Sequence, residues 1–331
     1  MAENSKIEWT DHTFNPWEGC QKVGPGCDHC YAEARNARFG GGQAVNWGPG
    51  APRRRTSAAN WRKPLAWNSD AGAFYARHGR RQRVFCSSLA DVFDNAVDPT
   101  WRRDLFDLIE LTPNLDWLLL TKRIGNVARM LPTQDWAARD NVWLGATIVN
   151  QAEADRDIPK LLAVPARRRF LSMEPLLGPV DLGRACRFAA FLATEVLDWV
   201  IVGGESGPSA RPMHPDWVRD LRDQCLAAGV PFMFKQWGEW WPINQMTEPE
   251  HRALYRSLVK ARAHESQENL DDIYGRACKV SSAVLHRDGT CLDIGTPMAF
   301  TAGSGATAIF KAGKKVAGRQ FDGREWSEVP R

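Results

Sequence analysis

Between residues 83 and 235, short apolar segments alternate with longer segments of helical periodicity. This alternation predicts βαβ units built on a parallel sheet. Several apolar segments are nearly continuous, as at 117–120, which is typical of strands covered on both faces. The segments expected to form strands are 7–13, 83–86, 116–121, 142–147, 169–173, 197–202 and 231–234. The segments expected to form helices are 100–111, 124–131, 151–164, 181–192 and 216–228.

Six or seven such units predict an α/β fold, specifically a parallel (β/α) barrel that is either closed or open on one side. A doubly wound open sheet is the alternative, because counting repeats does not show whether a sheet closes. The last expected helix has clear end signals. Pro215 follows His214 at its start, and Gly229 lies just after its end.

Two regions interrupt the repeating pattern. Residues 40–68 are rich in Gly, Pro and Arg, and we expect them to form an insertion that acts as a functional flap. After Trp240 the alternation ends, residues 245–266 have a helical pattern, and residues 280–329 suggest short strands and turns. We therefore expect a barrel over residues 1–240 and a smaller C-terminal extension over residues 241–331 that serves as a cap.

The composition fits a globular protein with a large core, since 44% of the 331 residues are hydrophobic and 25% are charged. The formal net charge of +4 is too small to indicate nucleic-acid binding by itself. No apolar run approaches the roughly 18 residues of a membrane span, and the N-terminus lacks the apolar region of a secretory signal. We expect a cytoplasmic protein, in which clustered cysteines more often bind metal than form disulfides.

Three cysteines form a CX6CX2C pattern at Cys20, Cys27 and Cys30. Residues 24–26, Gly-Pro-Gly, allow the intervening loop to turn tightly, so the three thiolates can reach one metal centre. A helical segment follows Cys30, and a helix N-terminus favours the thiolate over the thiol. The pattern therefore predicts a metal or iron–sulfur site.

The pattern leaves two kinds of metal site open. Structural zinc takes four protein ligands, and His12 or His29 would be needed to complete a Cys3His set. A [4Fe–4S] cluster with three cysteine ligands leaves one iron open to a small molecule. The position after the first strand of a parallel barrel, on the face where such folds build active sites, favours the cluster.

Polar residues follow each expected strand, and on a parallel barrel they meet at one rim. For a single residue, helix capping or ion pairing explains the polarity equally well, but the repetition over six strands favours a site. Lys122 and Arg123 suit a carboxylate, whereas Glu174 and Glu205 suit an ammonium group or ribose hydroxyls. The strand-end residues are Ser87, Ser88, Asp91, Lys122, Arg123, Thr147, Asn150, Glu174, Glu205, Ser206, Lys235 and Gln236.

The cysteine cluster, the aromatic residue beside it and the parallel barrel resemble the radical S-adenosylmethionine superfamily. The chain is more closely similar to the phage and bacterial three-Cys-motif family of unassigned function (DUF5131). This resemblance covers nearly the whole chain. It rests on the segments at 15–33, 90–94 (Ala-Asp-Val-Phe-Asp), 118–123 (Leu-Leu-Leu-Thr-Lys-Arg), 172–176 (Ser-Met-Glu-Pro-Leu), 202–207 (Val-Gly-Gly-Glu-Ser-Gly) and 234–238 (Phe-Lys-Gln-Trp-Gly).

The superfamily resemblance implies an enzyme with two cofactors, a [4Fe–4S] cluster on Cys20, Cys27 and Cys30 and S-adenosylmethionine on its open iron. It implies reductive cleavage of S-adenosylmethionine, radical chemistry on a substrate, and an external electron donor of the flavodoxin or ferredoxin type. We expect cofactor contacts from Tyr31, Ser87, Ser88, Lys122, Arg123, Thr147, Glu174, Glu205, Lys235 and Gln236.

The chain departs from the superfamily pattern at two places. The usual cysteine spacing is CX3CX2C, so the loop between Cys20 and Cys27 is longer than usual. The Gly-Gly-Glu motif usually follows the second strand, but here residues 203–205 follow a much later one. The usual role of the motif therefore does not transfer to Glu205, which faces either the cofactor or the substrate. Cys86, at the end of a strand, is either a small core residue or a hydrogen donor.

A basic segment with tryptophan suggests a nucleic-acid partner. Guanidinium groups and indole rings suit phosphate contacts and base stacking, although a solvated loop with salt bridges is an equally good interpretation. The residues are Arg53, Arg54, Arg55, Trp61, Arg62 and Lys63. The resemblance to a phage-type family implies modification or repair of a nucleic-acid base as the reaction. The alternative function is a zinc-stabilised nucleic-acid-binding protein without redox chemistry.

Overall fold

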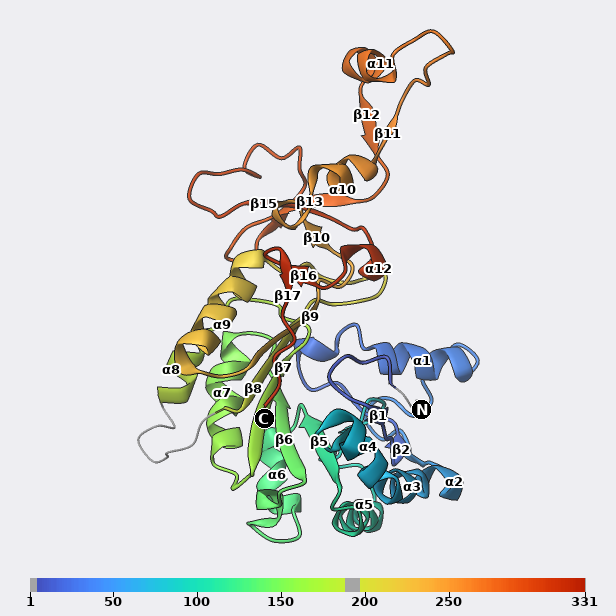
Figure 1. Cartoon of the computed structure of the whole chain (residues 1–331), viewed down its shortest axis with the longest axis vertical. Coiled ribbons are helices and arrows are strands. Elements are labelled where there is room, and N and C mark those ends of the chain that lie inside the picture. Colours follow the sequence, from blue (N-terminus) through green and yellow to red (C-terminus); the bar gives the residue numbers. More distant parts are fainter. Residues whose placement is uncertain (1–4, 188–196, 331) are drawn as a thin grey trace.

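A seven-stranded parallel sheet forms the centre of the computed structural model, which describes residues 5–187 and 197–330 (Figure 1). Its strand order is β1-β4-β5-β6-β7-β8-β9, so strands adjacent in the sheet follow one another along the chain. The strands are β1 (His12–Thr13), β4 (Gln82–Cys86), β5 (Leu115–Thr121), β6 (Val142–Thr147), β7 (Arg168–Met173), β8 (Trp199–Gly203) and β9 (Phe232–Gln236). The sheet curls into a half-barrel with β1 and β9 at its edges, which confirms the expected partial (β/α) barrel and excludes the doubly wound order.

Helices between successive strands cover the convex face of the sheet (Figure 1). Their starts follow from local capping: Asp98 accepts a hydrogen bond from the Thr100 amide at 2.8 Å, and Asn150 accepts one from the Glu153 amide at 3.0 Å. Gly229, with φ of +67°, ends the last of them, as expected. The helices are α5 (Pro99–Leu111), α6 (Ile124–Met130), α7 (Gln151–Leu162), α8 (Leu182–Arg187) and α9 (Pro215–Ala228). The end of the helix expected over 181–192 lies outside the described residues.

Large side chains fill the concave face of the half-barrel. Because side chains alternate along a strand, Phe85, Phe170 and Trp199 point to this face while their neighbours pack against the helices. Trp9 lies among them, with its ring centroid 4.6 Å from that of Phe85. The first strand was expected over 7–13, but only His12–Thr13 pairs with β4, because the chain turns at Thr10 and directs Trp9 into the interior.

The segment between β1 and β4 packs onto the edge of the barrel. Its short strand β3 (Arg54–Arg55) pairs with β2 (Trp17–Glu18), and Arg53 is buried in an ion pair with Asp94 at 2.7 Å. Within residues 40–68, the chain is thus attached to the edge of the half-barrel at β3. The helices of this region are α1 (Tyr31–Phe39), α2 (Ala58–Trp61), α3 (Lys63–Ser69) and α4 (Ala71–His78), and a 3-10 turn, η1, spans Pro25–Cys27.

Residues after β9 form a second, antiparallel sheet with the order β10-β15-β13-β14. Its strands are β10 (Trp241–Pro242), β13 (Ser282–Leu285), β14 (Cys291–Leu292) and β15 (Thr307–Phe310). The helix expected over 245–266 is limited to η3 (Ile243–Gln245) and α10 (Glu248–Ala253). It ends there because β11 (Tyr255–Ser257) pairs with β12 (Arg276–Cys278). This hairpin and α11 (Gln267–Tyr274) project from the rest of the chain (Figure 1).

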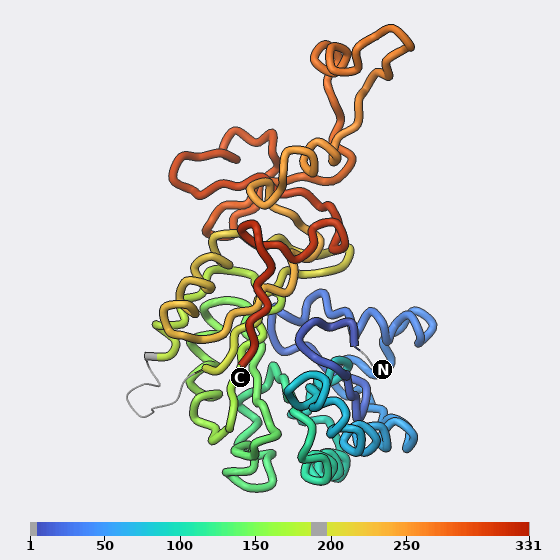
Figure 2. Tube along the Cα trace, in the orientation of Figure 1, coloured from blue at the N-terminus to red at the C-terminus, as the bar shows by residue number. Residues whose placement is uncertain are grey.

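The chain then returns to the half-barrel through α12 (Lys314–Ala317), β16 (Gln320–Phe321) and β17 (Arg324–Glu325). It runs beside β9, where the Phe234 amide donates to the Trp326 carbonyl at 3.0 Å (Figure 2). The division into domains at residue 240 stays a prediction. Among the described helices, none has the length and apolar character needed to cross a membrane.

Candidate functional site

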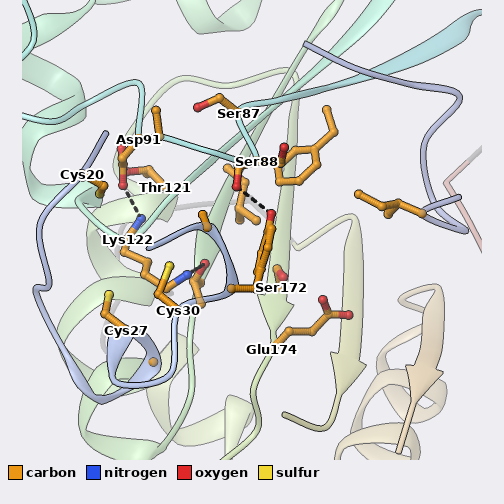
Figure 3. Close-up of a pocket in the computed structure, with 18 of the residues that line it drawn as sticks. Cys20, Cys27, Cys30, Ser87, Ser88, Asp91, Thr121, Lys122, Ser172 and Glu174 are labelled. Atoms are coloured by element: carbon orange, nitrogen blue, oxygen red, sulfur yellow. Dashed lines mark hydrogen bonds between the residues drawn. The ribbon is translucent and has the colours of Figure 1, made fainter. Parts of the chain in front are cut away.

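A cavity of about 540 Å³ lies at the carboxyl ends of the parallel strands. Figure 3 shows the three cysteines, the turn from Ser87 to Asp91, and Glu174 arranged around it. The strand-end and cysteine-loop residues expected at a site, and found in its lining, are Cys20, Cys27, Cys30, Tyr31, Ser87, Ser88, Asp91, Lys122, Arg123, Thr147, Glu174, Ser206, Lys235 and Gln236. The ends of six strands, β4 to β9, and the cysteine loop thus converge on one space.

The cysteine loop packs closely against the turn between β6 and α7. Cys20 follows β2, Cys27 ends the turn η1, and Cys30 is the residue before α1. A Cβ at Gly26 would lie 2.7 Å from Val149 Cγ1, so only glycine allows this approach. The Gly-Pro-Gly sequence therefore sets the path of the loop, as well as its tight turn.

Arg123 holds the first part of this loop. Its Nη2 donates to the Gln21 carbonyl at 2.9 Å, and its Nη1 lies 3.4 Å from Cys20 Sγ and 3.2 Å from Asp91 Oδ2. Burial raises the pKa of the Cys20 thiol to about 11, although the Arg123 charge opposes that rise. Without a bound metal, Cys20 is therefore a thiol near neutral pH.

Arg211 holds the second part of the loop. Its Nη2 donates to the Pro25 carbonyl at 2.8 Å, and its Nη1 donates to Asp28 Oδ2 at 2.9 Å. The same guanidinium forms a bidentate pair with Glu205, through Nε to Oε2 at 2.9 Å and Nη2 to Oε1 at 2.7 Å. His29 Nδ1 lies 3.1 Å from Glu205 Oε2. The two arginines thus fix the long loop at both ends.

Glu205 does not line the cavity, because both of its carboxylate oxygens contact Arg211. Burial alone would raise the pKa of this carboxyl, but hydrogen bonds from Arg211 and His29 lower it overall. Its geometry favours support of the cysteine loop over direct cofactor contact. Asn150 also does not line the cavity. Its side chain caps α7, which is the alternative role expected for a polar residue at a strand end.

Three buried polar atoms of lining residues lack hydrogen-bond partners within the described residues. They are Trp9 Nε1 and two oxygens, Ser87 Oγ and Glu174 Oε1. The other Glu174 oxygen accepts a hydrogen bond from Lys235 Nζ at 2.6 Å. Since buried polar groups normally find partners, these two oxygens fit a polar ligand in the cavity, such as an ammonium or hydroxyl donor.

The donor arrangement bears on the kind of metal. Across residues 5–187 and 197–330, no three His, Cys, Asp or Glu side chains are grouped closely enough to hold a single ion. Zinc at about 2.3 Å from tetrahedral thiolates needs sulfurs about 3.8 Å apart. The cysteines of a cubane each bind a different iron and stand further apart. Cys20, Cys27 and Cys30 line one cavity, and their grouping in the described residues does not form a ready-made site for a single ion.

Cys86 lies inside β4 and packs in the core rather than lining the cavity. Burial raises the pKa of its thiol. This placement fits the interpretation as a small core residue.

The basic segment expected to contact nucleic acid is largely paired within the chain. Arg53 pairs with Asp94, Arg54 with Glu18, and Arg55 with Asp104 at 2.6 Å while its guanidinium lies over the Trp61 ring at 4.4 Å. Arg62 is exposed and Lys63 is half-buried. These contacts fit a packed surface loop, and nucleic-acid binding by this segment stays a prediction.

The structure also shows lining and supporting residues that sequence reasoning missed. Ser172 shares a strand face with Glu174, so alternation along β7 could have found it. Lys6, Lys314 and the loop-holding Arg211 come from segments without a local signal, because only the tertiary fold brings them to the site.

The family model described as "Protein of unknown function (DUF5131)" matches residues 4–330. The chain belongs to this family, as its motifs indicated. A comparison with curated proteins finds no match.

Among solved structures, a mutant of spore photoproduct lyase is 14% identical with a TM-score of 0.38. The match covers 61% of this chain and 58% of that chain. Spore photoproduct lyase complexed with dinucleoside spore photoproduct is 12% identical with a TM-score of 0.35, and the match covers 78% of this chain and 72% of that chain. A double mutant of spore photoproduct lyase with bound AdoMet and the same dinucleoside is 11% identical with a TM-score of 0.36, and the match covers 79% of this chain and 73% of that chain. Likeness this distant carries no conclusion about activity.

Proposed function

We propose that this chain is a radical S-adenosylmethionine enzyme whose [4Fe–4S] cluster is held by Cys20, Cys27 and Cys30. One observation carries the proposal: these cysteines line the same cavity as the polar ends of six parallel strands. A cluster with three protein ligands keeps one iron free for a small molecule, and the cavity offers space beside it. The superfamily resemblance of the cysteine motif supports the same interpretation.

When bound, such a cluster supplies the electron that cleaves the carbon–sulfur bond of S-adenosylmethionine, and the resulting radical abstracts a hydrogen atom from the substrate. The chain's own residues bind and orient. Arg123, 3.4 Å from Cys20 Sγ, favours the thiolate of that ligand. Lys122, whose Nζ is 3.4 Å from Thr147 Oγ1, is positioned to pair with a carboxylate.

Glu174 and Ser87 complete the polar wall. Glu174 Oε1 is a free acceptor for an ammonium group or ribose hydroxyl, while Lys235 neutralises the other oxygen of that carboxylate. The apolar side of the cavity is formed by Trp9, Phe85 and Leu120, which exclude water from the reacting groups. An external donor of the flavodoxin or ferredoxin type would supply the electron. A nucleic-acid base is the proposed substrate, modified or repaired.

The proposal is tested on anaerobically reconstituted protein by iron content and by 5′-deoxyadenosine formation after reduction. Wild type is expected to hold about four irons per chain and to release 5′-deoxyadenosine from S-adenosylmethionine. Cys27→Ala should lose both properties. Cys291→Ala, which removes an exposed cysteine outside the cavity lining, should keep both. Stoichiometric zinc with no iron would refute the proposal and favour the zinc-stabilised alternative.

A further inference from the structure

The cavity lining carries more positive than negative charge. Six cationic side chains line it, against three anionic ones. The cations are Lys6, Lys22, Lys122, Arg123, Lys235 and Lys314, and the anions are Glu8, Asp91 and Glu174. A cleft lined mostly by one sign of charge concentrates ligands of the opposite sign. The cavity is therefore suited to an anion.

The surplus charge lies on particular lysines. Arg123 is paired with Asp91 at 3.2 Å, and Lys235 is paired with Glu174 at 2.6 Å. By contrast, Lys6 and Lys314 form no ion pair with any residue that the structure describes. Both are exposed as well as lining the cavity, so they lie at its mouth. An exposed, unpaired ammonium group on the lining of a cavity is suited to the oxygens of a phosphate.

The fold fixes the position of Lys314, although it lies nearly 80 residues after β9. The backbone on either side of α12 is bonded to the segment that follows β9. The Gly313 amide donates to the Glu239 carbonyl at 3.1 Å, and the Trp237 amide donates to the Gly318 carbonyl at 3.1 Å. The C-terminal residues therefore hold Lys314 at the cavity as a built part of its mouth.

We propose that the mouth of this cavity binds the phosphate of a nucleotide-type substrate through Lys6 and Lys314. Tyr31 lines the same cavity, is 60% exposed, and donates its hydroxyl to the Ser88 carbonyl at 2.6 Å, which fixes its ring for stacking with a base. This inference rests on the proposed function, because it names the substrate class of the same site. The phosphate belongs either to a mononucleotide or to a single strand.

Fluorescence anisotropy with a labelled oligothymidylate of about 12 nucleotides tests the inference on cluster-loaded protein. Lys314→Gln and Lys6→Gln should each weaken binding about fivefold to tenfold and reduce the slope of log affinity against log salt by about 0.7. Lys315→Gln is the matched control, because Lys315 lies on the same short helix and does not line the cavity. It should bind like wild type.

Competition by AMP separates the two sources of phosphate. Displacement of the oligonucleotide by AMP at similar affinity supports a mononucleotide, and much tighter binding of the oligonucleotide supports a strand. If neither probe binds, or if Lys314→Gln and Lys6→Gln bind like Lys315→Gln, the inference is overturned. If the protein cleaves S-adenosylmethionine but binds neither the oligonucleotide nor AMP, only this inference is refuted. If the oligonucleotide binds in a Lys314-dependent way but the protein holds no iron and cleaves no S-adenosylmethionine, only the proposed function is refuted.

Discussion

Replacing Arg211 by alanine should loosen the cysteine loop and release the proposed cluster. The Arg211 guanidinium donates to the Pro25 carbonyl at 2.8 Å and to Asp28 at 2.9 Å, and it forms the bidentate pair with Glu205. These contacts tie the loop that follows β8 to the turn between Cys20 and Cys27. Without them, the path of that turn depends on its packing alone.

The size of the effect follows from burial. The Glu205 side chain is 6% exposed, so loss of Arg211 leaves a nearly buried carboxylate without its main partner. Breaking a fully buried ion pair lowers the free energy of unfolding by about 3–5 kcal/mol. Because Arg211 is itself 31% exposed, we expect a loss of about 2–3 kcal/mol. With about 0.7 kcal/mol/K of unfolding entropy for 331 residues, the Tm should fall by about 4 °C.

The assay compares the rate at which a chelator removes iron from reconstituted protein. Residues that support metal ligands typically change metal affinity by about 10–100-fold, so iron loss from Arg211→Ala should be at least about tenfold faster. Arg167→Ala is the control, since Arg167 pairs with Asp140 at 3.2 Å and both side chains are largely exposed. Its iron loss should match that of wild type.

A double variant separates stability from loop anchoring. Adding Glu205→Gln to Arg211→Ala removes the unpaired carboxylate and should recover part of the lost Tm, but iron should still be lost quickly.

The ion pair between Arg211 and Glu205 also predicts that stability depends on pH. Since Arg211 and His29 lower the pKa of Glu205 below its usual value near 4.5, its stabilisation is complete above that value and is lost as the pH falls below it. Equal iron retention by Arg211→Ala and Arg167→Ala would show that Arg211 does not hold the cysteine loop.

Two further predictions concern stability. Gly145→Ala places a Cβ 2.3 Å from the Phe170 ring, so chemical denaturation should show a free energy of unfolding lower by about 1–3 kcal/mol. Gly72→Ala, in open space on α4, is the control and should be neutral or stabilising. Equal effects of the two substitutions would contradict the packing of the barrel interior. Burial alone would raise the pKa of Asp322, but hydrogen bonds led by Arg219 lower it to about 2. Asp322→Asn should therefore lower the free energy of unfolding by about 1 kcal/mol above pH 4, and this difference from wild type should shrink as the pH falls toward 2. A difference that does not change with pH would be the contrary result.

Much of the half-barrel was predictable from local sequence. The apolar run over β5 and the polar residues that follow it, Lys122 and Arg123, are local features that any parallel sheet places at its carboxyl edge. The same rule located Ser87, Thr147 and Glu174 in the lining. These predictions succeeded because strand direction alone decides on which edge a strand ends.

The parts that failed depend on contacts distant in sequence. Trp9 was expected in a strand, but the chain turns between Ile7 and Thr10, so β1 keeps only two residues and the Trp9 ring packs against Phe85. Glu205 ends a strand as expected, yet Arg211 draws both of its oxygens away from the cavity. Lys314 reaches the cavity only because the C-terminal segment folds back onto the residues after β9.

The proposed site has three cysteines holding a cluster with one iron free for S-adenosylmethionine. Electron paramagnetic resonance of the reduced, reconstituted protein, recorded before and after adding S-adenosylmethionine, probes that free iron. We expect a cluster signal whose shape changes when S-adenosylmethionine is added, because this ligand binds the free iron. A cluster signal that S-adenosylmethionine leaves unchanged would exclude an iron open to this ligand.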